Sequence, residues 1–344
     1  MNRLFSILAI TAPLLAAAGC AQDNSESTGE VARQYLQLWM DEYHPGVAPD
    51  ANGLYLLSDE PGTGGLWDSQ KGYTWGSITI RTLSGTIVST DSERLAQQLG
   101  TWAEGNYYGH RLFYTGENYS IAGLDALLEG MRMGGTRTAV IPAWMVTSSR
   151  FGTQQEYIDA ATSSSHYIYT VTPGGQTEDA VRWEKDSLTT YVKRHFGADI
   201  TSLAISSDAE PDSSFYFISD ILPFEGIEEL AAGTTVSVNY TGKLLNGQVF
   251  DTTDEKTAKD AGIYDPSRTY APVSVSLNSE MEDVSMDGST QLATGFKGGL
   301  HNMHWKGQKA SALFISSLGY STSGKGDMIP GYSPLLFELE ILSD

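Results

Sequence analysis

Residues 236–253 read VSVNYTGKLLNGQVFDTT. Apolar and polar residues alternate from Val236 to Tyr240, which is the period-two pattern of a strand with one buried face. Asn246 and Gly247 follow, and this dipeptide is a strong hairpin signal because both residues tolerate the positive φ of a tight turn. The stretch therefore predicts a β-hairpin.

The returning strand of this hairpin carries Phe250 beside Asp251. Together with Tyr240, these two residues predict an apolar pocket that has one carboxylate at its rim. Aromatic residues on strands more often only fill a core. The hairpin alone does not establish a site.

A second motif lies downstream, in the stretch GFKGGLHNMHWKGQ at residues 295–308. Phe296, Leu300 and Met303 stand at positions i, i+4 and i+7, which lie on one face of a helix. Gly307 is typical of a helix end. The motif therefore predicts a short helix that buries Phe296.

Two apolar runs after this helix predict strands, at residues 312–315 (ALFI) and 335–342 (LLFELEIL). Between them come the stretch SSLGY, which ends at Tyr320, then a glycine-rich loop and the dipeptide Ile329-Pro330. The order is therefore hairpin, helix, strand, loop and closing strand.

Residues 212–344 resemble an FKBP-type peptidyl-prolyl cis-trans isomerase domain, because these motifs occur in the order found in that family. The resemblance implies an α+β fold in which a twisted antiparallel β-sheet wraps on a short helix. It also implies an isomerase that twists X-Pro amides in an aromatic pocket and uses no cofactor. The partners that it implies are X-Pro-containing polypeptides and a macrolide ligand of the family.

The resemblance assigns roles to individual residues of this segment. It implies that the catalytic residues are Tyr240, Phe250, Asp251 and Tyr320. It implies that the substrate-binding residues are Leu292, Ala293, Phe296, Ile329 and Phe337. Asp251 would lie beside the twisting carbonyl, while the Tyr320 hydroxyl and the Ala293 N–H would donate to the substrate backbone.

Four residues depart from the family pattern. Phe296 stands where the family usually has tryptophan, and Ala293 replaces a larger β-branched residue. Ser321 follows Tyr320 where glycine is usual, and Ile315 occupies the place of a proline. These differences predict a preserved fold with weak isomerase activity.

An earlier part of the chain repeats this order of elements. A hairpin, a short helix, a strand and a closing strand are predicted at residues 77–88, 124–131, 136–141 and 166–171. Residues 45–175 are therefore predicted to form a diverged FKBP-like domain. The chain as a whole is predicted to contain two tandem FKBP-like domains with flanking helices.

The two copies differ in their pocket side chains. Alignment of Gly85 with Gly247, and of Met131 with Met303, pairs four pocket positions: Ile78 with Tyr240, Val88 with Phe250, Ser89 with Asp251 and Leu124 with Phe296. The first copy thus lacks the aromatic walls and the carboxylate. It is predicted to be non-catalytic.

An insertion in the first copy, at residues 100–119 (GTWAEGNYYGHRLFYTGENY), is dense in tryptophan and tyrosine. Such side chains supply large, rigid contact areas, which suits a binding loop. A loop that folds back over its own domain fits equally well. The sequence leaves both interpretations open.

Helices are predicted on either side of the first domain, at residues 30–43 and 177–196. The second of these begins with acidic residues and ends with basic ones, as the helix dipole favours. Residues 176–211 are predicted to form a linker helix and the domain boundary.

The N-terminus has the pattern of a secretory signal over residues 1–20, where Arg3 precedes an apolar run too short to span a bilayer. The sequence AAGC resembles a lipobox, and Cys20 is the chain's only cysteine. We therefore expect lipidation of Cys20, with residues 21–44 forming a tether and an N-terminal helix. The expected location is the cell envelope, lipid-anchored at the outer membrane on its periplasmic or surface face.

The composition is acidic, with 21 Lys and Arg against 42 Asp and Glu and a formal net charge of −21. Nucleic acid is therefore not an expected partner, because phosphate contacts need clusters of basic side chains. His301 and His304 are three residues apart, but no evident third ligand accompanies them. No metal site is predicted.

The leading hypothesis is a peptidyl-prolyl isomerase that assists protein folding in the bacterial cell envelope. One alternative is a non-enzymatic peptide-binding or chaperone lipoprotein that keeps the pocket for docking. Another is a scaffold component of a surface assembly.

Overall fold

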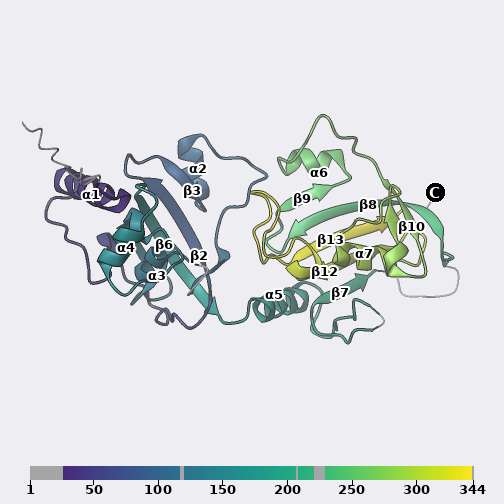
Figure 1. Ribbon diagram of the computed structural model, residues 1–344. Helices are drawn as coiled ribbons and strands as arrows, with labels where there is room; N and C mark the ends of the chain where they lie inside the picture. Colours follow the sequence, from purple (N-terminus) through teal and green to yellow (C-terminus); the bar gives the residue numbers. More distant parts are fainter. Residues whose placement is uncertain (1–25, 117–119, 207, 221–228, 343–344) are drawn as a thin grey trace, which may run out of the picture.

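The computed structural model describes residues 26–116, 120–206, 208–220 and 229–342. These residues form two antiparallel sheets that lie side by side, joined by the helix α5 (Ala180–His195) (Figure 1). Helices pack beside the sheets, so the predicted α+β class with two tandem domains is confirmed. The predicted signal peptide and the lipidation site Cys20 lie outside the described residues.

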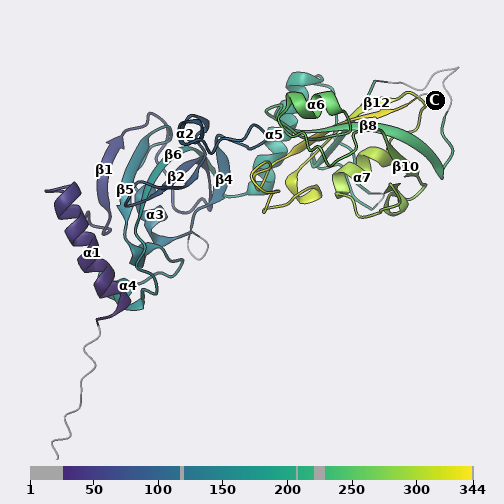
Figure 2. The ribbon, with the colours of Figure 1, turned by 90° about the horizontal axis from the view of Figure 1, so that it is seen from above.

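The first sheet has the strand order β1-β5-β6-β2-β3, and β4 also pairs with β2. Its strands are β1 (Tyr55–Glu60), β2 (Tyr73–Thr82), β3 (Ile87–Thr90), β4 (Arg111–Tyr114), β5 (Thr136–Ile141) and β6 (Tyr167–Thr177). The helices of this domain are α1 (Thr28–Tyr43), α2 (Glu93–Leu99), α3 (Ala122–Leu128), the 3-10 turn η1 (Ala143–Met145) and α4 (Gln154–Ala160). Helix α1 lies at the outer end of this domain (Figure 2). It buries Ala32, Leu36 and Met40 in the core of the domain.

The second sheet has the order β11-β10-β8-β13-β12-β7, and β9 also pairs with β8. Its strands are β7 (Phe215–Ser219), β8 (Thr234–Leu244), β9 (Val249–Thr252), β10 (Val273–Leu277), β11 (Ser285–Met286), β12 (Lys309–Phe314) and β13 (Leu335–Ile341). The helices are α6 (Glu255–Asp260) and α7 (Thr294–His301), with the 3-10 turns η2 (Met281–Asp283) and η3 (Ser316–Leu318).

The two sheets share one topology. The order β1-β5-β6-β2-β3 in the first domain corresponds to β7-β12-β13-β8-β9 in the second, and the short helices α3 and α7 both precede the matching strands β5 and β12. The predicted internal repeat is therefore confirmed by the pairing of the strands.

The two hairpins agree in their register as well. Each contains one irregularity, between Ile80 and Arg81 in the first domain and between Gly242 and Lys243 in the second. Ser89 pairs with Ile80 as Asp251 pairs with Gly242. The predicted alignment of the two hairpins therefore holds residue by residue.

A pair of threonine hydroxyls marks the same place in both hairpins. The Oγ1 atoms of Thr79 and Thr90 are 2.8 Å apart, and those of Thr241 and Thr252 are 2.9 Å apart. Cross-strand threonine pairs of this kind stabilise adjacent strands. The pair is present in both copies although the neighbouring pocket residues differ.

Glycine allows each short helix to approach its sheet closely. A Cβ added at Gly123 of α3 would lie 2.2 Å from Ile141 Cγ2, and one added at Gly295 of α7 would lie 2.1 Å from Phe314 Cγ. Ile141 and Phe314 are the last residues of the matching strands β5 and β12. Both helices therefore need glycine at this contact.

Both helices end earlier than their sequence periodicity indicates. Helix α3 ends at Leu128 and α7 at His301, so Met131 and Met303 follow their helices. Both methionines are nevertheless buried. The apolar periodicity therefore predicted the buried positions correctly but overextended the helices.

The predicted linker helix packs against the second sheet as part of the second domain. Leu188 and Val192 of α5 are fully buried and share a cluster with Leu313 of β12 and Leu336 of β13. Glu184 of the same helix is also buried. Its carboxylate accepts hydrogen bonds from the backbone N–H and the hydroxyl of Ser316, at 2.6 and 2.7 Å.

Candidate functional site

The hairpin of β8 and β9 brings a tyrosine and a carboxylate together. Gly247 has φ of 91° at the turn, as the Asn-Gly signal predicts. The turn aligns Tyr240 on β8 with Asp251 on β9, so that the tyrosine Oη donates to Asp251 Oδ2 at 3.1 Å. The predicted polar group at the pocket rim is therefore fixed in place by the strand that faces it.

Arg268 completes this polar group, and sequence reasoning missed it. Its Nη1 donates to Asp251 Oδ1 at 2.5 Å and its Nη2 to Tyr240 Oη at 3.3 Å. It lies 17 residues beyond Asp251, after helix α6. A signal was available, because Arg268 is the only arginine in residues 212–344 and a guanidinium matches the planar fork of a carboxylate.

Four aromatic rings form the apolar part of the site. The ring centroids of Tyr240 and Phe296 are 5.3 Å apart, those of Phe296 and Phe337 are 4.6 Å apart, and those of Phe250 and Phe337 are 5.5 Å apart. The interplanar angles of 47 to 80° are the tilted and edge-to-face arrangements that aromatic pairs prefer. These four rings, called the ring cluster below, come from β8, β9, α7 and β13.

The remaining predicted site residues border the ring cluster. Ile329 is buried in the same core, and Leu292, Ala293 and Tyr320 are partly buried against it. The Tyr320 ring stands edge-on to Phe250 at 6.2 Å. The structure therefore brings all nine predicted residues to one place, whereas their catalytic and binding roles stay predictions.

Burial raises the pKa of the site tyrosine still further above the physiological range. Burial, reinforced by the negative charge of Asp251, raises the pKa of Tyr240 to about 12. Its hydroxyl therefore stays protonated across the physiological range and donates to the carboxylate. The site consequently presents a carboxylate that is held by two donors.

The backbone of Ala293, whose N–H is a predicted substrate donor, lies at the start of α7. Ala293 precedes the first turn of the helix, and its carbonyl accepts from Lys297 N at 2.9 Å. Among the described residues its own N–H has no backbone acceptor. N–H groups at the start of a helix commonly lack such an acceptor, and the donor role of Ala293 stays a prediction.

Ser321 occupies a conformation that favours glycine. Its φ is 58°, in the left-handed region. Its N–H donates to Ser316 O at 2.7 Å, which fixes the turn after Tyr320. Ser321, which stands where glycine is usual, therefore has a strained backbone conformation.

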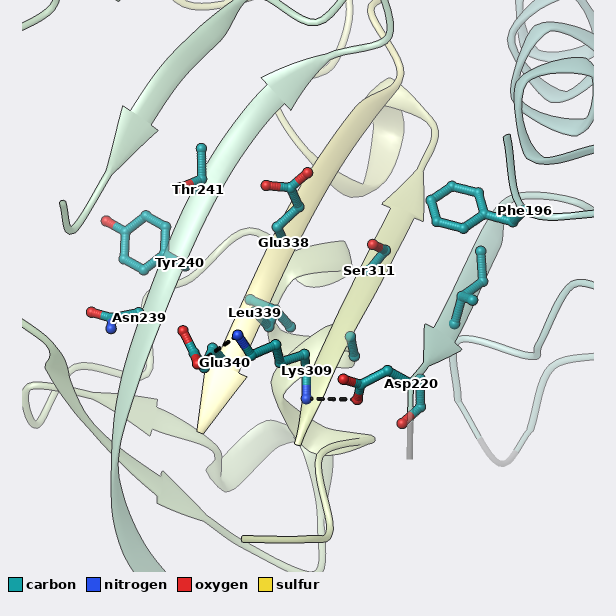
Figure 3. Close-up of a pocket in the computed structure, with 13 residues that line it drawn as sticks. Phe196, Asp220, Asn239, Tyr240, Thr241, Lys309, Ser311, Glu338, Leu339 and Glu340 are labelled. Carbon is teal, nitrogen blue, oxygen red and sulfur yellow. Dashed lines mark hydrogen bonds and ion pairs between the residues drawn. The ribbon is translucent and has the colours of Figure 1, made fainter. Parts of the chain in front are cut away.

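A cavity of about 480 Å³ lies on the outer face of the second sheet (Figure 3). Lys309 of β12 and Glu340 of β13 form an ion pair of 3.0 Å in its wall. Tyr240 is the one predicted site residue among those that line it. Its charged lining distinguishes it from the ring cluster, which lies within the core.

The first domain lacks the ring cluster. Val88 is 56 % exposed, whereas Phe250 at the equivalent position is 4 % exposed. Ile78, Ser89 and Leu124 occupy the other matching positions. That the first domain is not catalytic stays a prediction, and its described residues contain no aromatic wall at these positions.

The insertion at residues 100–119 lies against the second domain over part of its length. Gln248 Nε2 donates to Gly105 O at 2.9 Å, and Tyr107 N donates to Asp327 O at 2.8 Å. Residues 117–119 lie outside the described residues. Neither of the two open interpretations included this contact between the domains.

No metal centre is evident in the part of the chain that the structure describes. In that part, no group of three or more His, Cys, Asp or Glu side chains is placed to hold a metal ion.

Curated relatives of the chain are FKBP-type proteins, although no family model matches it. FK506-binding protein 2 of Dictyostelium discoideum is 29% identical over 140 residues, which cover 41% of this chain and 87% of the relative. A probable FKBP-type peptidyl-prolyl cis-trans isomerase of Haemophilus influenzae is 33% identical over 108 residues, covering 31% of this chain and 34% of the relative. An FK506-binding protein of Neisseria meningitidis serogroup B is 28% identical over 115 residues, covering 33% of this chain and 84% of the relative.

Solved structures also resemble the chain, among them the following two. The three FKBP domains of wheat FKBP73 match with a TM-score of 0.27 and 14% identity, over 84% of this chain and 92% of that one. A peptidyl-prolyl cis-trans isomerase of Pseudomonas syringae pv. tomato matches with a TM-score of 0.30 and 21% identity, over 47% of this chain and 91% of that one. The predicted resemblance to FKBP-type proteins is confirmed by the curated relatives.

Proposed function

We propose that this chain, which is related in sequence to FKBP-type proteins, is a peptidyl-prolyl cis-trans isomerase whose active site is the ring cluster with Asp251 at its rim. The observation that carries the proposal is the polar group of Tyr240, Asp251 and Arg268 at the edge of packed aromatic rings. The name of the Haemophilus influenzae relative gives the same activity.

The chemistry requires no nucleophile. Rotation about an X-Pro bond is slow because amide resonance must be broken, at a barrier of about 18–20 kcal/mol. A site that binds the twisted amide more tightly than the planar amide lowers this barrier. An apolar surface such as the ring cluster favours the twisted state, because the planar amide is the more polarised form and depends more on water.

Polar groups at the rim then orient the substrate. The Asp251 carboxylate is held by Arg268 and Tyr240, so it lies fixed beside the place where the substrate carbonyl turns. The Tyr320 hydroxyl and the Ala293 N–H supply donors for the substrate backbone. Fixed groups of this kind act without reorganisation during the rotation.

The test is an isomerisation assay on an X-Pro peptide with the full chain, by protease coupling or by NMR exchange. Phe250→Ala and Asp251→Asn are expected to lower kcat/KM by about tenfold or more. The first domain offers matched controls, because Val88→Ala and Ser89→Ala alter the equivalent positions and should leave the rate unchanged. No acceleration by the parent chain, or an acceleration that Phe250→Ala leaves intact, would contradict the proposal.

A ligand-binding experiment separates catalysis from docking. The relatives are named FK506-binding proteins, so we propose that FK506 binds the ring cluster and raises the melting temperature of the full chain. Binding of FK506 or of X-Pro peptides without any acceleration would favour the non-enzymatic chaperone alternative.

The proposed setting is the bacterial cell envelope, where a lipid on Cys20 anchors the protein and the isomerase assists the folding of exported chains. The support is the lipobox-like AAGC sequence at residues 17–20. No helix in the described part of the chain is long and apolar enough to cross a membrane. Fractionation of cells that express Cys20→Ser tests the anchor, because this variant should appear in the soluble fraction.

A further inference from the structure

The segment of residues 101–109, between α2 and β4 of the first domain, reaches across to the second domain (Figure 2). Tyr107 of this segment packs against the core that contains the ring cluster. An element of the first domain therefore lies beside the site proposed for the second.

Three separate parts of the second domain hold this segment. Gln248, in the turn before β9, donates to the carbonyl of Gly105 at 2.9 Å. Asp327 accepts from the N–H of Tyr107 at 2.8 Å. Ile263, in the loop after α6, comes so near to Gly105 that an added Cβ would lie 2.8 Å from its Cγ2.

These contacts lie close to the proposed site. Gln248 stands two residues before Phe250 of the ring cluster, and Asp327 stands two residues before the buried Ile329. The same added Cβ on Gly105 would lie 4.0 Å from Met328 Sδ, so Gly105 lies between the loops that carry Ile263 and Met328. Backbone from the first domain therefore lies against the loops on one side of the site.

We propose that residues 103–107 form a gate that selects substrates for the isomerase site. The gate leaves short X-Pro peptides access to the site, and it excludes an X-Pro bond within a continuous polypeptide until it is displaced. The proposal rests on the isomerase function proposed above. It also gives the first domain a role in that function.

The physical reason lies in the length of the two kinds of substrate. A four-residue peptide spans about 13 Å when extended, so it can occupy a site that is closed on one side. A continuous chain must extend past the proline in both directions. Two interdomain hydrogen bonds and a close packing contact hold the gate, which is a weak enough closure to be reversible.

A disulfide can lock the gate without touching the proposed catalytic residues. The close approach of Gly105 to Ile263 places cysteines at these two positions within cross-linking reach. The variant combines Gly105→Cys and Ile263→Cys with Cys20→Ser, so that the native cysteine cannot interfere. The single variant Ile263→Cys in the same Cys20→Ser background is the matched control, because it leaves Gly105 unchanged.

The experiment compares the oxidised and reduced forms of the full chain on two substrates. One is an X-Pro tetrapeptide, and the other is an unfolded protein whose refolding is limited by proline isomerisation. In the oxidised form we expect catalysis of refolding to fall by about tenfold, whereas the tetrapeptide rate should change by less than twofold. A reducing agent should restore the refolding activity, and the control should not respond to oxidation.

A second variant opens the gate instead of locking it. Gly105→Val places side-chain atoms where Ile263 already lies, so it should displace the segment and raise catalysis of refolding severalfold at an unchanged tetrapeptide rate. Equal refolding activity of the oxidised and reduced forms would overturn the gate, and so would an equal loss on both substrates. If the parent chain turns over neither substrate, the isomerase proposal fails. The gate is then tested by binding alone, and equal affinity of the oxidised and reduced forms for the unfolded protein would overturn it.

Discussion

Arg268 binds Asp251 through Nη1 and Oδ1 at 2.5 Å while its second nitrogen reaches the Tyr240 hydroxyl at 3.3 Å. One guanidinium thus orients both the carboxylate of β9 and the tyrosine of β8. The carboxylate remains accessible, because the side chain of Asp251 is 23% exposed. The rim group is therefore positioned by a residue that lies outside the hairpin.

Replacement of this arginine should impair the isomerase more than the fold. Arg268→Met removes both contacts, and we expect kcat/KM for an X-Pro peptide to fall by about tenfold, or about 1.4 kcal/mol of transition-state stabilisation. Arg268→Lys keeps the charge but not the fork, so it should recover only part of the rate. An unchanged rate in Arg268→Met would show that the orientation of Asp251 is unimportant for catalysis.

Removal of the strain at Ser321 should stabilise the second domain. Ser321→Gly places the residue that tolerates a φ of 58° in this turn, and we expect a gain of about 1 kcal/mol in the free energy of unfolding. Denaturant titration measures the change. Ser321→Ala is the control, since it removes the hydroxyl but keeps the strained Cβ, and a gain of equal size in Ser321→Ala would contradict the explanation.

The buried His166 should make the first domain sensitive to acid. Burial lowers the pKa of His166 to about 4. Its Nδ1 accepts from Ala143 N and its Nε2 donates to Ala32 O, each at 3.0 Å, so the ring is neutral in the folded state. The unfolded chain has the ordinary pKa of about 6.5 and binds a proton first as the pH falls.

The stability contributed by His166 is therefore fully present above pH 6.5 and is lost as the pH falls from 6.5 towards 4. The depression corresponds to at most about 3 kcal/mol. Denaturant titrations of the full chain between pH 7 and pH 5 should show this loss. His166→Gln should flatten the slope, and an identical slope in the variant would assign the pH dependence to other groups.

Truncation of the Glu184 side chain on helix α5 should destabilise the second domain. Glu184→Ala leaves the backbone N–H and the hydroxyl of the buried Ser316 without their acceptors, and we expect a loss of about 1–3 kcal/mol. Asp186→Ala on the same helix is the matched control, because Asp186 is exposed at the surface. Hydrogen exchange of β12 and β13 measures the effect, and equal exchange in both variants would contradict the role of Glu184.

The sequence predicted local features of the fold well where backbone chemistry decides them. The period-two alternation around Tyr240 and the glycines at positions 85 and 247 determine the register of both hairpins. The equivalence of Ser89 in the first hairpin to Asp251 in the second could therefore be inferred in advance. Helix ends were less predictable. Met131 and Met303 are buried after the helix has ended, because periodicity reports burial and not backbone conformation.

Contacts across long separations could not be predicted from local patterns. Arg268 reaches Asp251 only because helix α6 and its following loop return to the hairpin. The contacts of Gly105 and Tyr107 depend on how the two domains dock, which no periodicity encodes. The convergence of the nine predicted site residues could be predicted, because each was inferred from an ordered set of motifs. The contacts of Arg268, Gly105 and Tyr107 are not part of those motifs.

The threonine pairs give the two hairpins the same hydrogen-bonded frame, with Oγ1 atoms 2.8 Å apart in the first domain and 2.9 Å apart in the second. This frame does not depend on the pocket residues, because the side chains at the neighbouring positions differ between the two domains. The same scaffold can therefore carry different surfaces, and in the first domain it also carries the segment that contacts the second domain.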